Sequence, residues 1–393
     1  DDGNQFLWIS ERNGGKQLEL HNKKTAEIKV LTTKEFGLQS FVDVDCKKGF
    51  AYCLASSNPT QSQLFQIALD GKSEPTQITK SRGVHSANFS KDHSIYVHDE
   101  SLHDAMPQST VHHAGGKLVG TIPSVAEEAP VTPNAEFIQL DDEHKFYARL
   151  VRPQNFDPYL SYPVLVDVYG GPGSIKVIDS KRSLLLDQWL ADQGFVVVSL
   201  DGRGTPGRGR DFERAVGLHF GSVPLDDQVS GIQQLSAKYK ELDDKRIGIT
   251  GWSFGGYMSA LAALRRPDIY KAAVAGAPVV DWFDYDSCYT ERYLGLPEKH
   301  PEAYKESSLL TYAHDLKVPL LLVHGTTDDN VFFKHSLKLA DALFRNGQTF
   351  EILPLSGLTH MVPDPVVMEQ LWTRIITHFQ KHLGIPQQGT DRD

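Results

Sequence analysis

Short apolar runs separated by turn sequences dominate the first third of the chain. The clearest runs are residues 6–10, 18–20, 50–54, 64–69 and 94–98. Turn pairs such as Gly14-Gly15 and Asp70-Gly71 follow some of these runs. Short strands with turns of this kind are typical of an antiparallel all-β region such as propeller blades. Residues 1–130 are therefore predicted to form an all-β domain, although no internal repeat is clean enough to define.

The pattern changes after a polar, proline-rich stretch at residues 127–133. Beyond it, strand-like apolar runs alternate with helical ones, which predicts a mostly parallel, doubly wound sheet with helices on both faces. The last helical run, residues 364–383, repeats apolar side chains along one stripe: Val367, Leu371, Ile375, Phe379 and Leu383. We expect one α/β domain over residues 131–385. The polar tail, residues 386–393, is expected to be mobile.

One segment of this second region is built to expose a serine. The run Gly251–Gly256 (GWSFGG) lies between an apolar run that ends at Thr250 and a helix-forming run that begins at Tyr257. Strand, sharp turn and helix are the context in which G-x-S-x-G presents a nucleophilic serine, here Ser253. Its glycines permit a strained turn and a close approach of strand and helix. An ordinary glycine-rich turn is the alternative, and the flanking pattern favours the nucleophile.

An acid and a histidine follow at two later strand ends. Asp328 and Asp329 lie in the polar loop after a buried strand, and His360 lies in the loop after the apolar run 350–355. Serine, acid and histidine in this order, each beyond a different strand, is the chain order of the α/β-hydrolases. Ser253 would attack a carbonyl, His360 would move its proton, and a buried carboxylate would hold the imidazole in the useful tautomer.

The pattern alone does not choose between the two aspartates. One of Asp328 and Asp329 is expected to face His360, and the other to cap a following helix at Val331–Leu343. His324 lies inside the preceding strand, so its role is predicted to be structural. His360 is one of sixteen histidines and gains its weight only from its place after the last strand.

Further stretches complete a recognisable set: Tyr162–Pro172 (YPVLVDVYGGP), Asp201–Gly204 (DGRG), the serine turn, Trp282–Tyr293 and His324–Val331. With them the chain resembles the prolyl oligopeptidase family of serine peptidases, most closely its dipeptidyl peptidase IV branch in a bacterial form. The resemblance covers about residues 130–385. It implies an α/β-hydrolase domain with a triad of Ser253, Asp328 and His360. It also implies release of N-terminal dipeptides with proline or alanine in second place, through an acyl-enzyme on Ser253.

The same resemblance assigns the oxyanion and substrate-binding positions. The Tyr169 hydroxyl and the backbone N–H of Phe254 would stabilise the oxyanion. A core aromatic is the alternative for Tyr169, and the open Gly-Gly-Pro-Gly that follows argues against it. The positions that match the specificity pocket are Trp282, Tyr285, Tyr289, Val279 and Val331, with Asn330 matching a residue that binds a substrate carbonyl. An uncharged aromatic box suits proline, whereas a packed core or a subunit interface is the other interpretation of these aromatics.

The chain departs from the family in its first part. Family members carry a complete propeller, and residues 1–130 would supply only its last two or three blades. The paired glutamates with which the branch holds a substrate's amino terminus have no match, because Glu127 and Glu128 lie in the linker. We therefore expect a fragment of a longer protein. An oligopeptidase or small esterase without amine recognition, or a catalytically silent fragment, are the alternative functions.

Composition narrows the range of functions. The 393 residues carry a formal net charge of −10, with 40% hydrophobic and 23% charged residues. These proportions are ordinary for a two-domain globular protein, and the acidic balance argues against nucleic acid as a partner. No apolar run is long enough to span a bilayer. Three cysteines form no disulfide framework, and Cys46 and Cys53 are expected to be reduced core thiols.

The sequence gives weaker signals about a metal, a cofactor, partners and the cellular compartment. No clustered His and Cys spacing suggests a metal, and no cofactor is expected. A peptide is the expected substrate, and family habit favours a homodimer. Likeness to bacterial relatives favours the periplasm or secretion, with the cytoplasm as the alternative.

Overall fold

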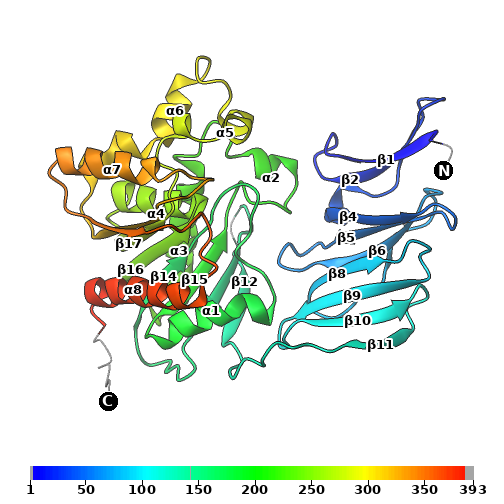
Figure 1. Cartoon of the computed structure of the whole chain (residues 1–393), viewed down its shortest axis with the longest axis horizontal. Coiled ribbons are helices and arrows are strands. Elements are labelled where there is room, and N and C mark those ends of the chain that lie inside the picture. The colour runs from blue at the N-terminus through cyan, green and yellow to red at the C-terminus, as the bar shows by residue number, and fades with distance from the viewer. Residues whose placement is uncertain (1–2, 142, 386–393) are drawn as a thin grey trace. The chain divides into compact units, whose positions relative to one another are not determined.

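The computed structural model describes residues 3–141 and 143–385 (Figure 1). The chain forms two compact units with separate cores. Of the described residues, the first comprises those up to 133 with 178–185 and 206–213, and the second comprises those in 134–177, 186–205 and from 214 to 385. The expected mobile tail, residues 386–393, lies outside the described residues. Among the described helices, none combines the length and apolarity that a bilayer span requires.

The first unit is built from three antiparallel sheets in which strands that follow one another in sequence pair in space. The sheets are β1 (Gln5–Ser10), β2 (Gln17–Asn22) and β3 (Ile28–Val30); β4 (Leu38–Asp45), β5 (Phe50–Ala55), β6 (Gln63–Ala68) and β7 (Thr76–Gln77); and β8 (Gly83–Phe89), β9 (Ile95–Leu102), β10 (Gln108–His113) and β11 (Leu118–Ile122). A short 3-10 helix, η1 (Lys34–Phe36), precedes β4. The predicted all-β character of this region is confirmed, and each four-stranded meander has the form of a propeller blade.

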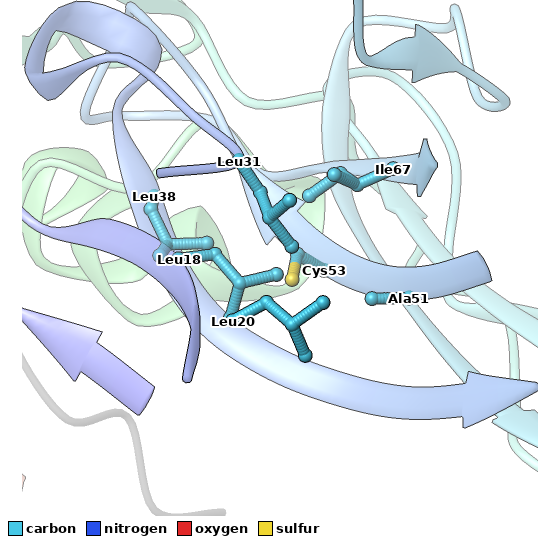
Figure 2. Packing of buried hydrophobic residues seen from close by; sticks show 7 residues of the cluster. All are labelled: Leu18, Leu20, Leu31, Leu38, Ala51, Cys53 and Ile67. Atoms are coloured by element: carbon cyan, nitrogen blue, oxygen red, sulfur yellow. The ribbon is translucent and has the colours of Figure 1, made fainter. Parts of the chain in front are cut away.

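Aliphatic side chains from the first two sheets form one core of this unit (Figure 2). The cluster consists of Leu18, Leu20, Leu31, Leu38, Ala51, Cys53 and Ile67. Burial raises the pKa of the Cys53 thiol to about 12, so it remains protonated and packs as a small apolar side chain. Cys46 is exposed, so the expectation that both cysteines are core thiols was wrong for Cys46. The turn that carries Cys46 points its side chain to solvent instead of into the sheet.

The second unit contains an eight-stranded sheet in the order β12-β13-β15-β14-β16-β17-β18-β19. Its strands are β12 (Ala135–Gln139), β13 (Tyr147–Val151), β14 (Tyr162–Asp167), β15 (Val196–Asp201), β16 (Leu242–Trp252), β17 (Tyr270–Gly276), β18 (Leu320–Gly325) and β19 (Glu351–Leu355). From β15 to β19 the neighbours are parallel, whereas β12 and β13 pair antiparallel. All residues of β15 and β18 are buried, as expected for strands covered on both faces. The predicted α/β-hydrolase fold class is confirmed.

Helices lie between the parallel strands in sequence, and one follows the last strand. They are α1 (Lys181–Asp192), α2 (Arg210–Arg214), α3 (Val223–Lys238), α4 (Phe254–Arg265), α5 (Ser287–Leu294), α6 (Pro301–Ser307), α7 (Lys334–Arg345) and α8 (Pro365–Leu383), with the 3-10 helices η2 (Trp282–Asp284) and η3 (Leu309–Asp315). The apolar stripe predicted for the last helix is present in α8, with Leu371, Ile375, Phe379 and Leu383 buried and Val367 half-buried in the first turn.

The parallel order of the strands positions the candidate site. The carboxyl ends of parallel strands lie along one edge of a sheet, where the loops that follow them meet. Ser253 follows β16 directly, the loop with Asp328 follows β18, and the loop with His360 follows β19. These three strands belong to one sheet, so residues more than 100 positions apart in sequence reach the same edge.

Candidate active site

Ser253 occupies a sharp turn between β16, which ends at Trp252, and α4, which begins at Phe254. Its φ is 61° and its ψ is −117°, a conformation that residues other than glycine rarely adopt. The backbone N–H of Ser253 donates to the carbonyl of Gly276 over 2.9 Å, and its own carbonyl accepts the N–H of Tyr257 over 2.9 Å. These bonds fix the strained turn from both sides, as a nucleophile elbow requires.

The glycines of the turn are required by close packing. A Cβ on Gly255 would lie 2.2 Å from the carbonyl oxygen of Val168, and a Cβ on Gly251 would lie 2.3 Å from the same atom. Both distances are far inside van der Waals contact, and the obstacle is backbone, which cannot rotate away. Strand β14, the elbow and α4 can therefore pack together only with glycine at these two positions.

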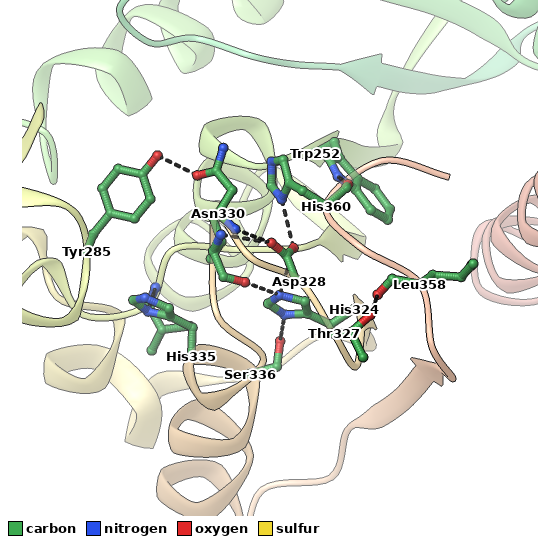
Figure 3. Close-up of polar contacts among 12 residues, drawn as sticks. Trp252, Tyr285, His324, Thr327, Asp328, Asn330, His335, Ser336, Leu358 and His360 are labelled. Atoms are coloured by element: carbon green, nitrogen blue, oxygen red, sulfur yellow. Dashed lines mark hydrogen bonds and ion pairs between the residues drawn. The ribbon is translucent and has the colours of Figure 1, made fainter. Parts of the chain in front are cut away.

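Asp328 faces His360 from the loop after β18 (Figure 3). The His360 Nδ1–H donates to Asp328 Oδ2 over 2.7 Å. Asp328 Oδ1 accepts the backbone N–H groups of Asn330 and Val331, each over 2.9 Å. The Asp328 side chain is fully buried and that of His360 is 14% exposed. The carboxylate is held in one orientation by these bonds, and it leaves His360 Nε2 with the lone pair that a general base needs.

The structure distinguishes the two aspartates. Asp329 is exposed, whereas Asp328 is buried and carries the bond to His360. The predicted second role, a cap on a helix at Val331–Leu343, was wrong. Helix α7 begins at Lys334, three residues later, and its N-cap residue Phe333 makes no side-chain cap hydrogen bond. The backbone N–H groups of Asn330 and Val331, in the loop before α7, are bound by Asp328 and not by Asp329.

His324 supports the same loop from inside the sheet. Its Nε2–H donates to the Val331 carbonyl over 2.7 Å, and its Nδ1 accepts the Ser336 hydroxyl over 2.8 Å (Figure 3). Burial lowers the pKa of His324, so the ring is neutral and suits this pattern of one donor and one acceptor. The ring thus clamps the loop that carries Asp328.

His360 is also tied to the residue that precedes the serine. The indole Nε1–H of Trp252 donates to the His360 carbonyl over 2.8 Å. This bond brings the loop after β19 against the end of β16. Within the described part of the chain, Ser253 Oγ has no hydrogen bond to His360. In the absence of substrate such bonds are often long and tighten only in the complex.

Tyr169 and Phe254 lie beside the elbow. Tyr169 is half-buried two residues beyond β14, and its ring centroid is 5.9 Å from that of Phe254. Burial raises the pKa of the Tyr169 hydroxyl, which therefore stays protonated and able to donate. Phe254 is the first residue of α4, so its backbone N–H has no intrahelical acceptor. A Cβ on Gly171 would lie 2.3 Å from the Phe254 ring, which explains the open sequence after Tyr169.

The aromatic residues expected to line a pocket form one cluster. The rings of Trp282 and Tyr289 stack with centroids 6.2 Å apart, and Tyr285 packs edge-on against both, at 5.8 Å and 5.5 Å. The Tyr285 hydroxyl donates to Asn330 Oδ1 over 2.9 Å (Figure 3). Trp282 is buried, whereas Tyr285 and Tyr289 are half-buried and thus border open space. Val279 and Val331 are both buried.

Sequence reasoning missed Phe220, which lies at the centre of this cluster. The Phe220 ring is fully buried, 4.8 Å from Trp282 and 5.1 Å from Phe254 between centroids. It also contacts Tyr289 and Tyr293, at 6.3 Å and 5.6 Å. Phe220 stands in a short connection before α3 with no periodic pattern around it, so no local signal could have identified it.

The triad residues do not form a metal site. Among the described residues, the two groups of His and Glu side chains that could hold an ion are His85, His98 and Glu100, and Glu351, His378 and His382. Neither group includes a residue of the candidate active site.

Comparisons with known proteins match both parts of the chain. Residues 184–386 match the model of the prolyl oligopeptidase family, and residues 1–106 match that of the dipeptidyl peptidase IV N-terminal region. The chain is 31% identical over 348 residues to dipeptidyl peptidase 8 of Mus musculus, which covers 83% of this chain and 39% of the relative. It is 37% identical over 241 residues to dipeptidyl peptidase 4 of Sus scrofa. That match covers 60% of this chain and 31% of the relative.

A solved structure extends the likeness to nearly the whole chain. The crystal structure of Porphyromonas gingivalis dipeptidyl peptidase 4 matches with a TM-score of 0.89 and 28% identity, over 97% of this chain and 55% of that one. The chain thus spans 39% or less of the length of these two curated relatives and about half of this solved one. The family match covers more than half of the chain, and the chain belongs to the prolyl oligopeptidase family.

Proposed function

We propose that the protein is a serine peptidase that removes dipeptides from the N-termini of peptides with proline or alanine in second place. The observation that carries the proposal is the buried hydrogen bond from His360 Nδ1 to Asp328 Oδ2, at the sheet edge where Ser253 occupies a strained elbow. The names of the relatives, which are dipeptidyl peptidases, support the same reaction class.

The first half of the reaction forms an acyl-enzyme. Ser253 Oγ attacks the carbonyl carbon of the substrate's second residue while His360 Nε2 takes the hydroxyl proton. Asp328 holds the imidazole through Nδ1 and stabilises the imidazolium that results. The same proton then passes to the departing amine, the C–N bond breaks, and the dipeptide remains esterified to Ser253.

The second half releases the dipeptide. A water molecule gives a proton to His360 and attacks the ester, and the proton returns to Ser253 Oγ as the bond breaks. In both halves the negative charge develops on the carbonyl oxygen, where the Tyr169 hydroxyl and the Phe254 N–H would donate to it. Loss of one such donor typically lowers the rate by about 10²–10³.

The aromatic cluster would set the preference for the second residue. The half-buried rings of Tyr285 and Tyr289, packed against the buried Trp282, offer apolar surface without charge. Burial of a side chain of the size of proline stabilises binding by about 1.5–3 kcal/mol. A charged side chain would lose its hydration there without gaining a partner. Asn330 is exposed beside this cluster and is oriented by Tyr285, where its amide could bind a substrate carbonyl.

Turnover of a Gly-Pro-anilide by the wild-type chain and its Ser253→Ala variant tests the proposal. We expect the variant to lose activity and to lose covalent labelling by a fluorophosphonate probe, which reacts only with an activated serine. Unchanged turnover in the variant would refute the acyl-enzyme on Ser253. Labelling of the wild type without any hydrolysis of the anilide would point to the same triad with a different substrate.

An oligopeptidase or esterase that does not recognise a free amine is the second candidate. It is favoured by one observation, which is that the adjacent pair Glu127 and Glu128 is exposed in the segment between β11 and β12. Free and N-acetylated Ala-Pro substrates separate the two. A dipeptidyl peptidase must hydrolyse the acetylated substrate poorly, whereas equal rates would favour the second candidate.

A further inference from the structure

Three potential ligand side chains meet where the start of β19 packs beside the C-terminal half of α8. Glu351 is the first residue of β19, and His378 and His382 are four positions apart on α8. Residues at i and i+4 lie on one face of a helix, and this is the spacing with which two helical histidines share one zinc ion. The ring centroids of the two histidines are 4.7 Å apart.

Three histidine nitrogens in this group lack a well-formed hydrogen bond. His378 is 1% exposed, and both its ring nitrogens are buried without a hydrogen bond among the described residues. Nε2 of His382 is buried and unpaired in the same way. The Pro319 carbonyl lies near the ring and acts to raise the pKa of His378, but it forms no well-aligned hydrogen bond to the ring. An unpaired buried polar atom destabilises the folded chain, so three together call for a missing partner.

The geometry suits a cation. One ligand atom from each residue lies within 4.8 Å of the other two, and His378 Nδ1 is 3.7 Å from Glu351 Oε1. Two ligands about 2.1 Å from a tetrahedral ion are about 3.4 Å apart, so small side-chain rotations would complete the set. Arg374 pairs with Glu351 Oε2 and leaves Oε1 facing His378. A ligand carboxylate held in this way by an outer partner is usual in metal sites.

Protonation and access are also favourable. Burial is the main cause that lowers the pKa of His378, to about 4, and it also lowers the pKa of His382, so both rings offer lone pairs at neutral pH. Lys381 and Arg374 add positive charge nearby, which Glu351 partly offsets. A cavity of about 410 Å³ is lined by Glu351 and His382, so two of the three side chains border open space.

We propose that Glu351, His378 and His382 bind one divalent transition-metal ion, with zinc as the best match to two imidazoles and a carboxylate. The site would be structural. It joins the start of β19 to the end of α8, and the 351–382 segment that it closes carries His360. Closing a long segment stabilises the folded chain by limiting the freedom of the unfolded one. His360 lies beyond the other end of β19, so the ion would take no part in the reaction.

The second group of candidate ligands provides the control. His85 Nδ1 and His98 Nε2 are hydrogen-bonded to each other over 2.9 Å, and His85 Nε2 bonds to the Ser81 carbonyl over 2.9 Å. Those histidines are satisfied without an ion. A His98→Asn variant therefore removes a buried histidine from a similar His and Glu cluster in which no metal ion is proposed.

Metal binding by the full chain after treatment with EDTA tests the proposal. We expect one equivalent of Co²⁺ to give the visible absorption of tetrahedral coordination and to be displaced by Zn²⁺. The His382→Ala and Glu351→Gln variants should bind at least about 10-fold more weakly, because even outer-sphere partners of metal ligands change affinity by about 10–100-fold. His98→Asn should bind like the wild type.

Two further measurements keep the outcome decisive. Zn²⁺ should raise the melting temperature of the wild type and of His98→Asn but not of His382→Ala. Far-UV circular dichroism checks that each variant is folded. If His382→Ala does not fold, Glu351→Gln, whose side chain is 42% exposed, provides the test. Absence of the Co²⁺ spectrum, its persistence in both ligand variants, or its loss in His98→Asn would overturn the proposal. None of these results depends on peptidase activity.

Discussion

At the scale of single residues, the site depends on how Asp328 is surrounded. Its carboxylate receives three N–H donors, two from the backbone of its own loop and one from His360. Two fixed backbone donors orient the group before any substrate binds, and the third transfers that orientation to the imidazole. Asp329, one position along, is exposed and takes part in none of these bonds.

The neighbouring aspartates allow a matched pair of substitutions. Asp328→Asn should lower kcat by about 10⁴, because an amide in place of the carboxylate favours the wrong tautomer of His360 and cannot stabilise the imidazolium. Asp329→Asn should leave kcat within about twofold of the wild type, because its side chain contacts solvent. Steady-state hydrolysis of a Gly-Pro-anilide measures both. Equal losses in the two variants would show that Asp328 has no special role.

At the scale of elements, the site is held by how strands end and helices begin. The elbow requires β16 to end and α4 to begin with one strained residue between them. The His360 loop lies between β19 and α8, and α8 has a well-formed start. Asp364 Oδ1 accepts the N–H groups of Val366 and Val367 over 2.9 Å and 3.2 Å, and Pro365 occupies the first helical position.

The cap at Asp364 should contribute measurably to stability. Asp364→Ala is expected to lower the free energy of unfolding by about 0.5–2 kcal/mol, because two N–H groups of the first turn lose their acceptor. Asp364→Ser should recover most of that loss, since a hydroxyl can cap the same groups. Urea unfolding followed by tryptophan fluorescence gives the values. A Ser variant as unstable as the Ala variant would mean that the loss comes from the loop and not from the cap.

At the scale of the molecule, the second unit contains buried charged side chains next to its sheet: Arg149, Asp187 and Asp201. Asp201, at the end of β15, accepts the backbone N–H groups of Lys176 and Val177 over 2.8 Å and 2.9 Å. Burial nevertheless raises its pKa to about 6. Arg149 pairs with Asp187 in the same buried layer. Because the pKa of Asp201 differs between the folded and the unfolded chain, this residue links the stability of the unit to pH.

Asp201 should make the folded state less stable as pH rises from about 4 to about 6. Its folded pKa is higher than the unfolded value, so the folded chain binds more protons in this range and loses stability as they leave. A shift of about two units corresponds to about 2–3 kcal/mol. The free energy of unfolding of the wild type minus that of Asp201→Asn, measured at pH 4, 5, 6 and 7, isolates this effect. A difference that is constant over this range would contradict it.

The local chemistry of the chain determined much of the fold and the site. Apolar periodicity was enough for the all-β first region, the parallel sheet and the stripe of α8, because strand and helix periods are set by backbone geometry. The glycines around Ser253 marked the elbow for a similar reason, since only glycine fits that turn. Serine, acid and histidine could then be placed at strand ends from their order alone.

Contacts between distant segments were decided only by the tertiary structure. It buried Asp328 and exposed Asp329, it placed Phe220 among the aromatics of η2 and α5, and it began α7 at Lys334. It also brought Glu351 beside His378, 27 positions along the chain, although no sequence motif joins them. Side-chain burial and contacts between distant residues depend on how complete helices and strands pack. The local sequence around a residue does not determine that packing.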